Sequence, residues 1–294
     1  MGRITPRLLL TALLAVLSMS VVPLLIRTTS ANEITIGLVR IAIATALMSP
    51  FLIWRGNLRD LSRADWFSLL LVGLVFGCHW LAYFVSIKMS NASIAAIAVS
   101  TYGIHLLLLN WRIKKQRIRP IEWGAVVLCF VGVVLIAPAF DVRNQITLGM
   151  LIGVLSGFLY ACLPLLHQRI MHVPTMSRAW GQFTFAGLVF LPLSAYSNWQ
   201  LTSGDWWRLA VLGVVCTVIG HSLWVKASSE LPGVITSLAY YLYVPLAMIG
   251  AFLILDEQLT GVMVLGACFI ITANICIALL AWQRSRPPLR APAD

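Results

Sequence analysis

Long apolar stretches alternate with short polar segments along almost the whole chain. A helix needs about 20 mostly apolar residues to cross the hydrocarbon core of a membrane. The pattern therefore predicts ten membrane-spanning helices, at Leu8–Ile26, Ile34–Trp54, Trp66–Ile87, Ala92–Trp111, Trp123–Phe140, Leu148–Leu166, Ala179–Tyr196, Leu209–Val225, Val234–Leu255 and Val262–Trp282. Such a succession is typical of an all-α integral membrane protein.

The first stretch has a second interpretation, as a signal peptide. Arg3 and Arg7 precede it, and the sequence TSA at Thr29–Ala31 resembles a cleavage site. We favour a membrane span, because the internal repeat described below gives this stretch a counterpart in the middle of the chain.

The amino-acid composition also indicates that much of the chain is surrounded by lipid. Of the 294 residues, 60% are hydrophobic and 11% are charged, whereas a soluble domain has about 25% charged residues. The net charge of +11 would suit nucleic acid or the cytoplasmic face of a membrane, and the apolar composition favours the membrane. We expect a lipid bilayer as partner and no nucleic acid. The oligomeric state is left open, with a monomer favoured.

Basic residues are distributed unequally between the two sides of the predicted bundle. The side that holds both termini carries sixteen of them, at Arg3, Arg7, Arg55, Arg59, Arg63, Arg112, Lys114, Lys115, Arg117, Arg119, Arg169, Arg178, Lys226, Arg284, Arg286 and Arg290. The opposite loops carry Arg27, Lys88 and Arg143, while Arg40 and Arg208 lie within or at the edge of spans. Cytoplasmic loops are enriched in Arg and Lys, so both termini are predicted to be cytoplasmic.

The two halves of the chain resemble each other when the second is laid over the first. The sequence DWFSLLLVGL at Asp65–Leu74 corresponds to DWWRLAVLGV at Asp205–Val214. This and weaker matches predict two homologous five-helix repeats, residues 1–140 and 141–294. Because five is odd, the second repeat must enter the membrane upside down relative to the first.

The loop between spans four and five agrees with this inversion. It reads WRIKKQRIRP from Trp111 to Pro120, and its counterpart in the second half reads LDEQLTG from Leu255 to Gly261. Aligning the two places Lys115 over Glu257. The same element is thus predicted to be basic where it faces the cytoplasm and acidic where it faces outward.

With this architecture, the element P-x10-D-E-Q-L-T from Pro245 to Thr260 resembles the EamA branch of the drug/metabolite transporter superfamily, and within it the bacterial aromatic amino acid exporters. The first half departs from the pattern, with His105 in place of the proline and Lys115 in place of the glutamate. The resemblance implies an exporter in the bacterial inner membrane that works by alternating access around a central cavity.

Polar side chains within the spans are candidates for a substrate site. His79 and Tyr83 follow helical spacing in span three, with Ser86 beyond them, so they form a stripe that should face the bundle interior. His221 and Trp224 belong to a similar stripe in span eight. The stripe in span eight is displaced by two residues from the positions that correspond to the stripe in span three. The two stripes are therefore not expected to point in equivalent directions within their repeats. For both stripes, hydrogen bonding between helices is the alternative role.

Spans four and nine add further candidates. In span nine, Ser237 and Tyr240 precede Pro245, and a proline inside a span frees backbone carbonyls that an ammonium group can use. Tyrosine rings also stack on aromatic solutes, although an interfacial aromatic belt is the alternative role for tyrosines. Ser100 and Tyr102 are the candidates in span four.

One arginine, Arg40, lies inside a span, and its counterpart in the second half is Gln182. An arginine in lipid must find a partner, and we favour a clamp on backbone carbonyls over a ligand for a substrate carboxylate. None of the ten acidic residues lies at mid-membrane depth. The cavity is therefore expected to suit a neutral or zwitterionic molecule better than a permanent cation.

Together these features predict a broad exporter of amino acids with aromatic and other neutral side chains. Export of other small amphipathic metabolites or drugs is the alternative. A membrane-embedded enzyme is less favoured, because the sequence has no H-E-x-x-H motif, no pair of aspartates and no nucleophile with its base. The six cysteines lie in apolar runs without a C-x-x-C, and no Gly-rich phosphate loop is present, so neither metal nor cofactor is expected.

Overall fold

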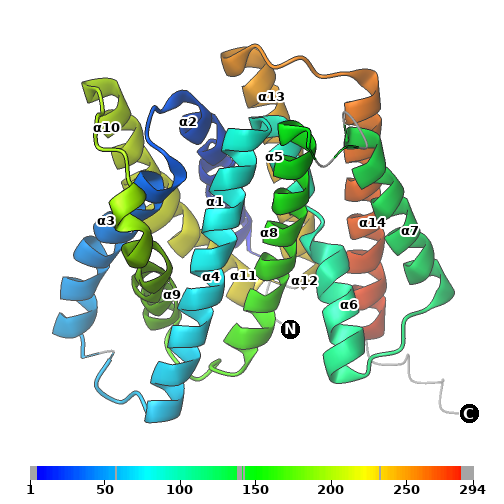
Figure 1. The fold of residues 1–294 in the computed structure, drawn as a ribbon. Helices are drawn as coiled ribbons and strands as arrows, with labels where there is room; N and C mark the ends of the chain where they lie inside the picture. Colours follow the sequence, from blue (N-terminus) through cyan, green and yellow to red (C-terminus); the bar gives the residue numbers. More distant parts are fainter. Residues whose placement is uncertain (1–4, 57, 138–140, 142, 232, 286–294) are drawn as a thin grey trace, which may run out of the picture.

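The computed structural model describes residues 5–56, 58–137, 141, 143–231 and 233–285, without the side chains of residues 229, 233, 234, 237 and 285. Within these residues the chain is a bundle of helices without a strand (Figure 1). The helices are α1 (Pro6–Ser20), α2 (Val22–Thr28), α3 (Glu33–Trp54), α4 (Arg63–Met89), α5 (Ala92–Val99), α6 (Tyr102–Lys114), α7 (Pro120–Ile136), α8 (Gln145–Gln168), α9 (Thr175–Phe190), η1 (Leu191–Tyr196), α10 (Ser203–Val211), η2 (Leu212–His221), α11 (Ser222–Glu230), α12 (Gly233–Tyr241), α13 (Tyr243–Leu255) and α14 (Gly261–Ser285).

Eight helical stretches of the described residues are long and apolar enough to cross a membrane, and each corresponds to one predicted span. The other two predicted spans are shorter as helices. The span predicted at Trp123–Phe140 corresponds to α7, an apolar helix of 17 residues, and Phe140 lies outside the described residues. The span predicted at Ala179–Tyr196 corresponds to α9, which has 16 residues and is followed by the 3-10 helix η1. The fold is that of a multi-pass helical membrane protein.

The fourth and ninth predicted spans are each broken into two helices. The fourth is interrupted at Ser100 and Thr101, between α5 and α6, and the ninth at Leu242, between α12 and α13. Pro245 accounts for the second break, because proline lacks an N–H and crowds the carbonyl four residues before it. The first break needs no proline. The hydroxyls of Ser100 and Thr101 each donate to the carbonyl oxygen three residues earlier, at 2.7 Å.

Two residues in the left-handed region set the register between the halves. Lys115 (φ 54°) ends α6, and Asp256 (φ 53°) ends α13, so these two residues occupy equivalent turns. The predicted pairing of Lys115 with Glu257 is therefore wrong by one position, and Gln116 is the counterpart of Glu257. In the sequence, Lys115 over Glu257 also places Gln116 over Gln258, and this identity favoured a register that the backbone conformation of the two turns does not share.

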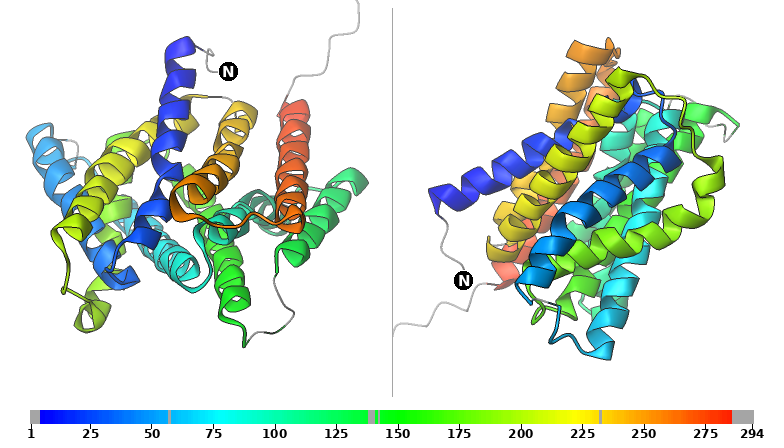
Figure 2. Two further views of the ribbon diagram at one scale, coloured as in Figure 1. Left: turned by 90° about the horizontal axis from the view of Figure 1, so that it is seen from above. Right: turned by 90° about the vertical axis from the view of Figure 1, so that its left-hand side faces the viewer.

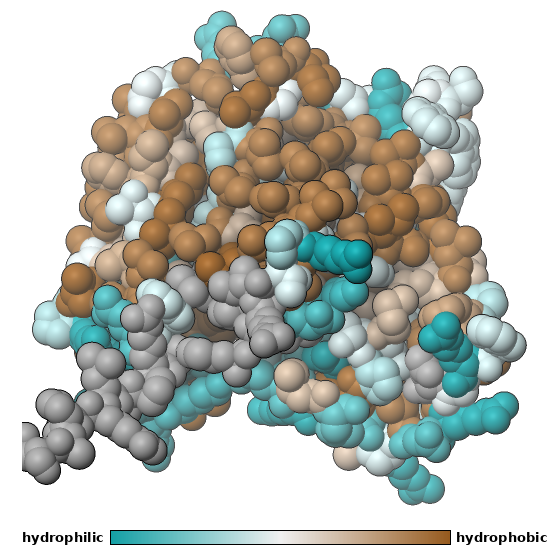
Figure 3. Space-filling model, turned by 180° about the vertical axis from the view of Figure 1, so that it is seen from behind, coloured by the Kyte–Doolittle hydropathy of each residue, from teal (hydrophilic) through white to brown (hydrophobic). Residues whose placement is uncertain are grey.

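The helix α4 packs mainly against α8 and α9. The helices α7 and α14 pack together at one edge, and α3 and α10 lie at the opposite edge (Figure 2). On the face shown in Figure 3, hydrophobic side chains cover the middle, while polar side chains gather mainly at the lower end. In the orientation of Figure 1, the upper end carries the loops at 29–32, 90–91, 197–202 and 256–260, and the lower end carries residues 55–56 and 58–62 and the loops at 115–119 and 169–174.

Candidate functional site

Two adjoining cavities lie inside the bundle. The smaller has a volume of about 40 Å³ and is lined by Met19, Val22, Arg40, His79, Trp80, Tyr83, Phe84, Val99, Tyr160, His221, Tyr240 and Tyr243. The larger has a volume of about 400 Å³ and is lined by Tyr102, Leu106, Tyr160, Leu163, Pro164, His167, Gln168, Met171, Arg178, Gln182, His221, Trp224, Val225, Ser228 and Thr236. Tyr160 and His221 line both, so the two cavities meet at these side chains.

The larger cavity reaches the surface at the lower end of the bundle. Gln168 and Met171, at the lower end of α8 and in the loop after it, are part of its lining and are exposed. The smaller cavity lies deeper, and its lining residues Arg40, His79 and Tyr83 are buried. Access from the lower end therefore leads first into the larger cavity and then to the smaller one.

Aromatic rings form a continuous surface along both cavities. The ring centroids of His79 and Tyr160 are 4.8 Å apart, those of Tyr160 and Tyr240 5.7 Å, and those of Tyr240 and Tyr243 5.8 Å, all in stacked arrangements. Tyr102 meets Tyr240 edge-on at 4.7 Å. Rings of this kind offer flat apolar faces together with hydroxyl and imidazole edges. The arrangement suits a small molecule that has both an apolar part and polar groups.

His79 joins two helices and also lines the smaller cavity. Its Nδ1 lies 3.0 Å from the carbonyl oxygen of Ser156 and 2.8 Å from the hydroxyl oxygen of Ser156. That hydroxyl donates to the His79 carbonyl oxygen at 3.0 Å, so α4 and α8 are tied at this level. The alternative role predicted for this stripe, hydrogen bonding between helices, is therefore observed for His79. The same ring also stacks on Tyr160 and lines the cavity, so His79 is placed to contact a bound molecule as well.

His221 comes to the same cavity as His79 although the two are displaced in the repeat. His221 lies two positions further beyond Asp205 than His79 lies beyond the repeat-related Asp65. The intervening segment η2 is a π-helix, which uses more residues per turn than an α-helix. The extra residues are absorbed there, and both imidazole rings pack around Phe76, with centroids 5.9 and 5.8 Å from it. The expectation that the two stripes face differently is wrong for these histidines.

Arg40 does not act as the predicted clamp on backbone carbonyls. Its side chain is only 1% exposed, and its Nε donates to Thr217 Oγ1 at 2.9 Å. The guanidinium carbon lies 4.0 Å from the ring centroid of Trp80 and 5.3 Å from that of Phe84. The atoms Nη1 and Nη2 have no hydrogen-bond partner among the described residues. A buried, oriented cation with two free donor atoms thus lines the smaller cavity.

The counterpart of Arg40 in the second half, Gln182, lines the larger cavity and has a partner. Its Oε1 lies 2.9 Å from His167 Nε2. Arg178, in the same helix, donates from Nε to the Val173 carbonyl oxygen and from Nη2 to Thr175 Oγ1, each at 3.1 Å. The side chains of Gln182 and Arg178 are therefore held by the protein itself, in contrast to the guanidinium of Arg40.

The structure brings most of the predicted site residues to these cavities. Six of them line one cavity or both, namely His79, Tyr83, Tyr102, His221, Trp224 and Tyr240. Ser100 lines neither of the two, because its hydroxyl donates to the Ile97 carbonyl oxygen at the helix break. The side chain of Ser237 lies outside the described residues.

Sequence reasoning missed Tyr160 and Trp80, which touch the centre of the site. Tyr160 lies between the two cavities and stacks on His79. It is the one tyrosine in the stretch Gln145–Gln168, one turn beyond Ser156, and this isolated polar ring was the available signal. Trp80 supports the guanidinium of Arg40. Trp80 lies in α4 and Arg40 in α3, so their proximity could not be predicted from the spacing of residues along one helix.

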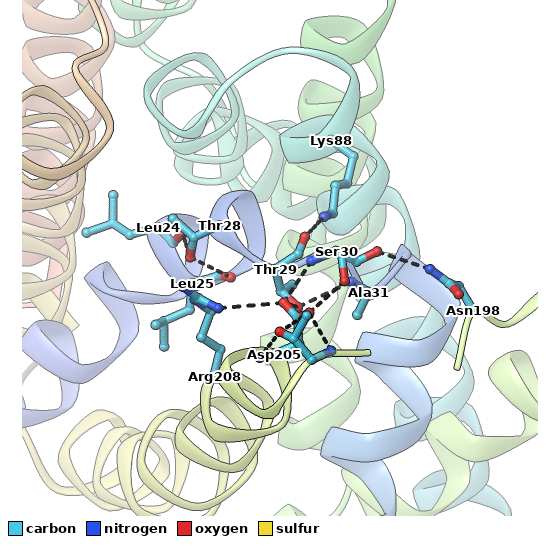
Figure 4. Close-up of polar contacts among 11 residues, drawn as sticks. Leu24, Leu25, Thr28, Thr29, Ser30, Ala31, Lys88, Asn198, Asp205 and Arg208 are labelled. Carbon is cyan, nitrogen blue, oxygen red and sulfur yellow. Dashed lines mark hydrogen bonds and ion pairs between the residues drawn. The ribbon is translucent and has the colours of Figure 1, made fainter. Parts of the chain in front are cut away.

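A network of hydrogen bonds ties the upper end of the bundle (Figure 4). Asp205 accepts hydrogen bonds from Thr29 Oγ1 at 3.0 Å, from Ser30 N at 3.0 Å and from Ser30 Oγ at 2.7 Å. Lys88 Nζ donates to the Thr29 carbonyl oxygen at 2.6 Å. Thr202 completes a capping box with Asp205 at the start of α10. The loop between α2 and α3 is thereby fastened to the first turn of α10 and to the end of α4.

A second carboxylate at the upper end caps α5. Glu257 accepts from the backbone N–H groups of Ala92 at 2.8 Å and Ser93 at 3.1 Å, and from the Ser93 hydroxyl at 2.7 Å. Free N–H groups at a helix start favour a negative charge. The loop between α13 and α14 is thus held on the start of α5, the first helix of the broken fourth span.

The described residues contain no group of three or more His, Cys, Asp or Glu side chains that could hold a metal ion. The six cysteines are unpaired within the structure. The chemistry available in the cavities is therefore that of aromatic rings, hydroxyls, imidazoles and guanidinium groups.

Comparisons with known proteins agree with this architecture. The chain is 25% identical to an uncharacterized transporter of Archaeoglobus fulgidus, over 80% of this chain and 86% of that protein. It is 27% identical to the threonine/homoserine exporter RhtA of Salmonella typhimurium, over 80% of this chain and 78% of that protein. It is 24% identical to the biotin transporter of Escherichia coli, over 75% of each chain. A crystal structure covers 95% of this chain and 99% of its own chain, with a TM-score of 0.67 at 17% identity, and so shares the fold.

The family assignment rests on a match to nearly the whole chain. The sequence profile of the EamA-like transporter family matches residues 7–137 and again residues 147–279. The two matched stretches lie one in each predicted half. The chain therefore belongs to the EamA-like transporter family, within the drug/metabolite transporter superfamily.

Proposed function

We propose that this transporter exports neutral amino acids, including those with aromatic side chains, across the bacterial inner membrane by alternating access. In this proposal the chain crosses the membrane ten times, in two inverted repeats at residues 1–140 and 141–294. Both termini and the basic lower end lie in the cytoplasm. The unequal distribution of basic loop residues supports the orientation, and the inverted repeat supports alternating access.

The observation that carries the proposal is the composition of the two cavities. Their described lining residues include tyrosines, tryptophans, histidines and two arginines, and no Asp or Glu. A permanent cation would lose its hydration there without meeting an opposite charge. A zwitterion with an apolar side chain can use rings and dipoles instead. The volume of about 400 Å³ falls within the range of pockets that hold small molecules.

The residues proposed to contact the substrate are those predicted residues that line the cavities, His79, Tyr83, Tyr102, His221, Trp224 and Tyr240. Ser237 stays a proposed contact on α12. Ser100 is assigned instead to the helix break, where its carbonyl oxygen also accepts a hydrogen bond from Asn274 Nδ2 at 3.2 Å.

The position of the opening of the larger cavity supports export. The larger cavity reaches the surface at the basic lower end, so substrate is proposed to enter from the cytoplasm. The relative RhtA is a threonine/homoserine exporter. Among the described residues, neither cavity is lined by a carboxylate that could carry a proton, so we propose movement down the substrate gradient.

The test is transport by purified protein in liposomes, with labelled phenylalanine, labelled threonine and a quaternary ammonium dye, with and without a pH gradient. We expect amino-acid flux without the gradient and little dye flux. The variants His79→Ala and Tyr83→Ala should insert and remain folded but transport more slowly. Dye flux without amino-acid flux would contradict the proposed substrate, and flux that requires the pH gradient would contradict the proposed energetics.

A second candidate is the transport of other small amphipathic carboxylates. It is favoured by the relative that is a biotin transporter, because biotin shares a carboxylate and an apolar chain with the amino acids. Adding unlabelled biotin to the same liposomes separates the two candidates. Inhibition of phenylalanine flux by biotin would broaden the substrate class, whereas biotin flux without phenylalanine flux would replace it.

A further inference from the structure

Arg40 is the cation in the smaller cavity, and nothing in the described protein neutralises it. Three ion pairs join described residues, His172–Asp65, Arg208–Asp205 and Arg284–Glu122, and none includes Arg40. A charge that is removed from water is costly unless it is paired. Arg40 lies deep in the bundle and is almost completely buried.

The guanidinium is nevertheless held in a defined orientation. Thr217 Oγ1 accepts from Arg40 Nε at 2.9 Å and itself donates to the Leu212 carbonyl oxygen at 2.8 Å. This second bond uses a carbonyl five residues earlier in the π-helix. Trp80 supports one face of the guanidinium at 4.0 Å. The two remaining nitrogens, Nη1 and Nη2, therefore form a fixed pair of donors without partners among the described residues.

We infer that Arg40 binds the carboxylate of the transported molecule, with Nη1 and Nη2 donating to its two oxygens. A guanidinium edge matches a carboxylate in geometry, and such bidentate pairs are among the strongest hydrogen-bonded contacts in proteins. This inference rests on the proposed function and deepens it, because it names the group that the site recognises.

The shape of the two cavities fits this assignment. The cavity at Arg40 has about 40 Å³, which is room for a few water molecules, so a small head group such as a carboxylate fits beside the guanidinium. The larger cavity of about 400 Å³ begins at Tyr160 and His221 and leaves room for the rest of the molecule. A carboxylate bound at Arg40 would point its apolar side chain toward the rings of Tyr102 and Trp224.

The charge balance favours a single carboxylate over a more highly charged anion. Among the described residues, Arg40 is the one Lys or Arg that lines the smaller cavity. One negative charge neutralises it, whereas a dianion such as a phosphate monoester would bring an uncompensated charge into a buried space. The nearest imidazoles, His79 and His221, face the same cavity and would have to be protonated to balance a dianion.

The experiment is equilibrium binding of labelled phenylalanine to the full-length purified protein, with two competitors of nearly the same shape. 3-Phenylpropionate keeps the carboxylate and lacks the ammonium group, whereas phenylalaninamide keeps the ammonium group and lacks the carboxylate. We expect 3-phenylpropionate to compete and phenylalaninamide to compete about 10- to 100-fold less well. Equal competition by the amide would overturn the inference.

Variants distinguish a binding role from a structural one. Arg40→Gln should weaken phenylalanine binding by about 30-fold or more, and Arg40→Lys by about 10-fold, because lysine keeps the charge but loses the paired donors. The melting temperature of Arg40→Gln should stay equal or rise, since an unpaired buried charge is removed. Arg208→Gln is the matched control, as Arg208 lies outside both cavities, and it should keep the preference for the carboxylate. A large fall in melting temperature with unchanged binding per folded molecule would show a structural role.

The outcomes also separate this inference from the proposed function. If phenylalanine does not bind but 3-phenylpropionate binds and requires Arg40, the amino-acid proposal fails and the carboxylate site stands. If phenylalanine binds and Arg40→Gln leaves its affinity unchanged, the transporter proposal stands and the carboxylate site fails. If neither phenylalanine, threonine nor 3-phenylpropionate binds the wild-type protein, both are overturned.

Discussion

The upper and lower ends of the bundle place different side chains at repeat-related positions. At the upper end, Glu257 accepts three hydrogen bonds from the start of α5. Its counterpart at the lower end is Gln116, in the basic loop between α6 and α7. The start of α5 corresponds in the repeat to the start of α12. One broken span therefore has a carboxylate cap, whereas the residue that corresponds to this carboxylate for the other broken span is an amide among basic residues.

The repeat-related aspartates show the same contrast. Asp205 and Asp65 each close a capping box in the first turn of their helix. Asp205 also accepts from Thr29 and from two donors of Ser30, whereas Asp65 has one further partner, His172 Nε2 at 2.7 Å. The ring of His172 is largely exposed, with 65% of its side-chain surface accessible.

This difference in contacts between the two ends indicates how two similar halves can favour the conformation in which the upper end is closed. The upper end is closed by carboxylates that accept several backbone and hydroxyl donors, while the described part of the lower end has fewer such contacts and holds the mouth of the larger cavity. In an alternating-access transporter the two ends must open in turn, so each of these contacts is expected to act on the balance between the two states.

The largest expected effect concerns topology and is all-or-none. The basic loop should lie inside and its acidic counterpart outside, because basic loop residues are retained in the cytoplasm. Reporters fused after Arg119 and at the C-terminus should both read cytoplasmic. A reporter inserted in Leu255–Gly261 should read external. An external signal after Arg119 would exclude the inverted arrangement of the halves.

The next largest effect should be a difference in stability between the two aspartates. Asp205→Asn removes an acceptor shared by two segments, whereas Asp65→Asn weakens a capping box and one contact with an exposed histidine. We expect the melting temperature in detergent to fall by at least about 2 °C more for Asp205→Asn. Equal falls for the two variants would show that the network around Ser30 adds nothing to stability.

A conformational effect is expected for Glu257→Gln. Loss of the charged cap at α5 should destabilise the closed upper end by about 1–2 kcal/mol, which raises the population open at that end by about 5- to 30-fold. Labelling of Val22→Cys in a cysteine-free background, with a membrane-impermeant thiol reagent added on the side of the upper end, reports this population, since Val22 lines the smaller cavity. Asp256→Asn removes the same charge one residue away and is the control. If both variants change the labelling rate equally, the cap is not the cause.

The smallest expected effect is the converse change, Gln116→Glu. It gives the lower end the carboxylate that the upper end has, and a negative charge near a helix start contributes about 0.3–1 kcal/mol. Closure of the lower end should become more favourable, and the labelling rate of Val22→Cys should rise by about 2- to 5-fold. Gln116→Lys should leave the rate unchanged or lower it. A fall in the rate for Gln116→Glu would refute the correspondence between the two ends.

The fold was largely predictable because lipid restricts the possibilities. Backbone groups in a membrane must be satisfied within the segment, so length and apolarity locate helices. Eight of the ten predicted spans are long, apolar helices in the structure. The spans predicted for α7 and α9 begin after these helices do and run past their ends at Ile136 and Phe190, since neither the end of α7 nor the 3-10 geometry of η1 has a strong signal in hydropathy.

The candidate site was predictable where side-chain type and helical spacing sufficed. The polar stripe of His79 and Tyr83 was identified because polar groups in lipid must face the interior. The position of His221 was not, because the π-helix changes the register within an otherwise ordinary span. The broken fourth span was also unpredicted, since hydroxyl groups at Ser100 and Thr101 replace the proline of its counterpart.

The sequence by itself determined that the chain is a helical membrane protein, where most of its helices lie and which loops are basic or acidic, because hydrophobicity and charge act locally along the chain. Only the tertiary structure decided which side chains meet. Arg40 and Thr217 lie in different halves of the chain, yet they form one hydrogen bond beside Trp80, and the same packing leaves Nη1 and Nη2 without partners among the described residues. Pairing of this kind depends on distances between helices, which no periodicity along one helix contains.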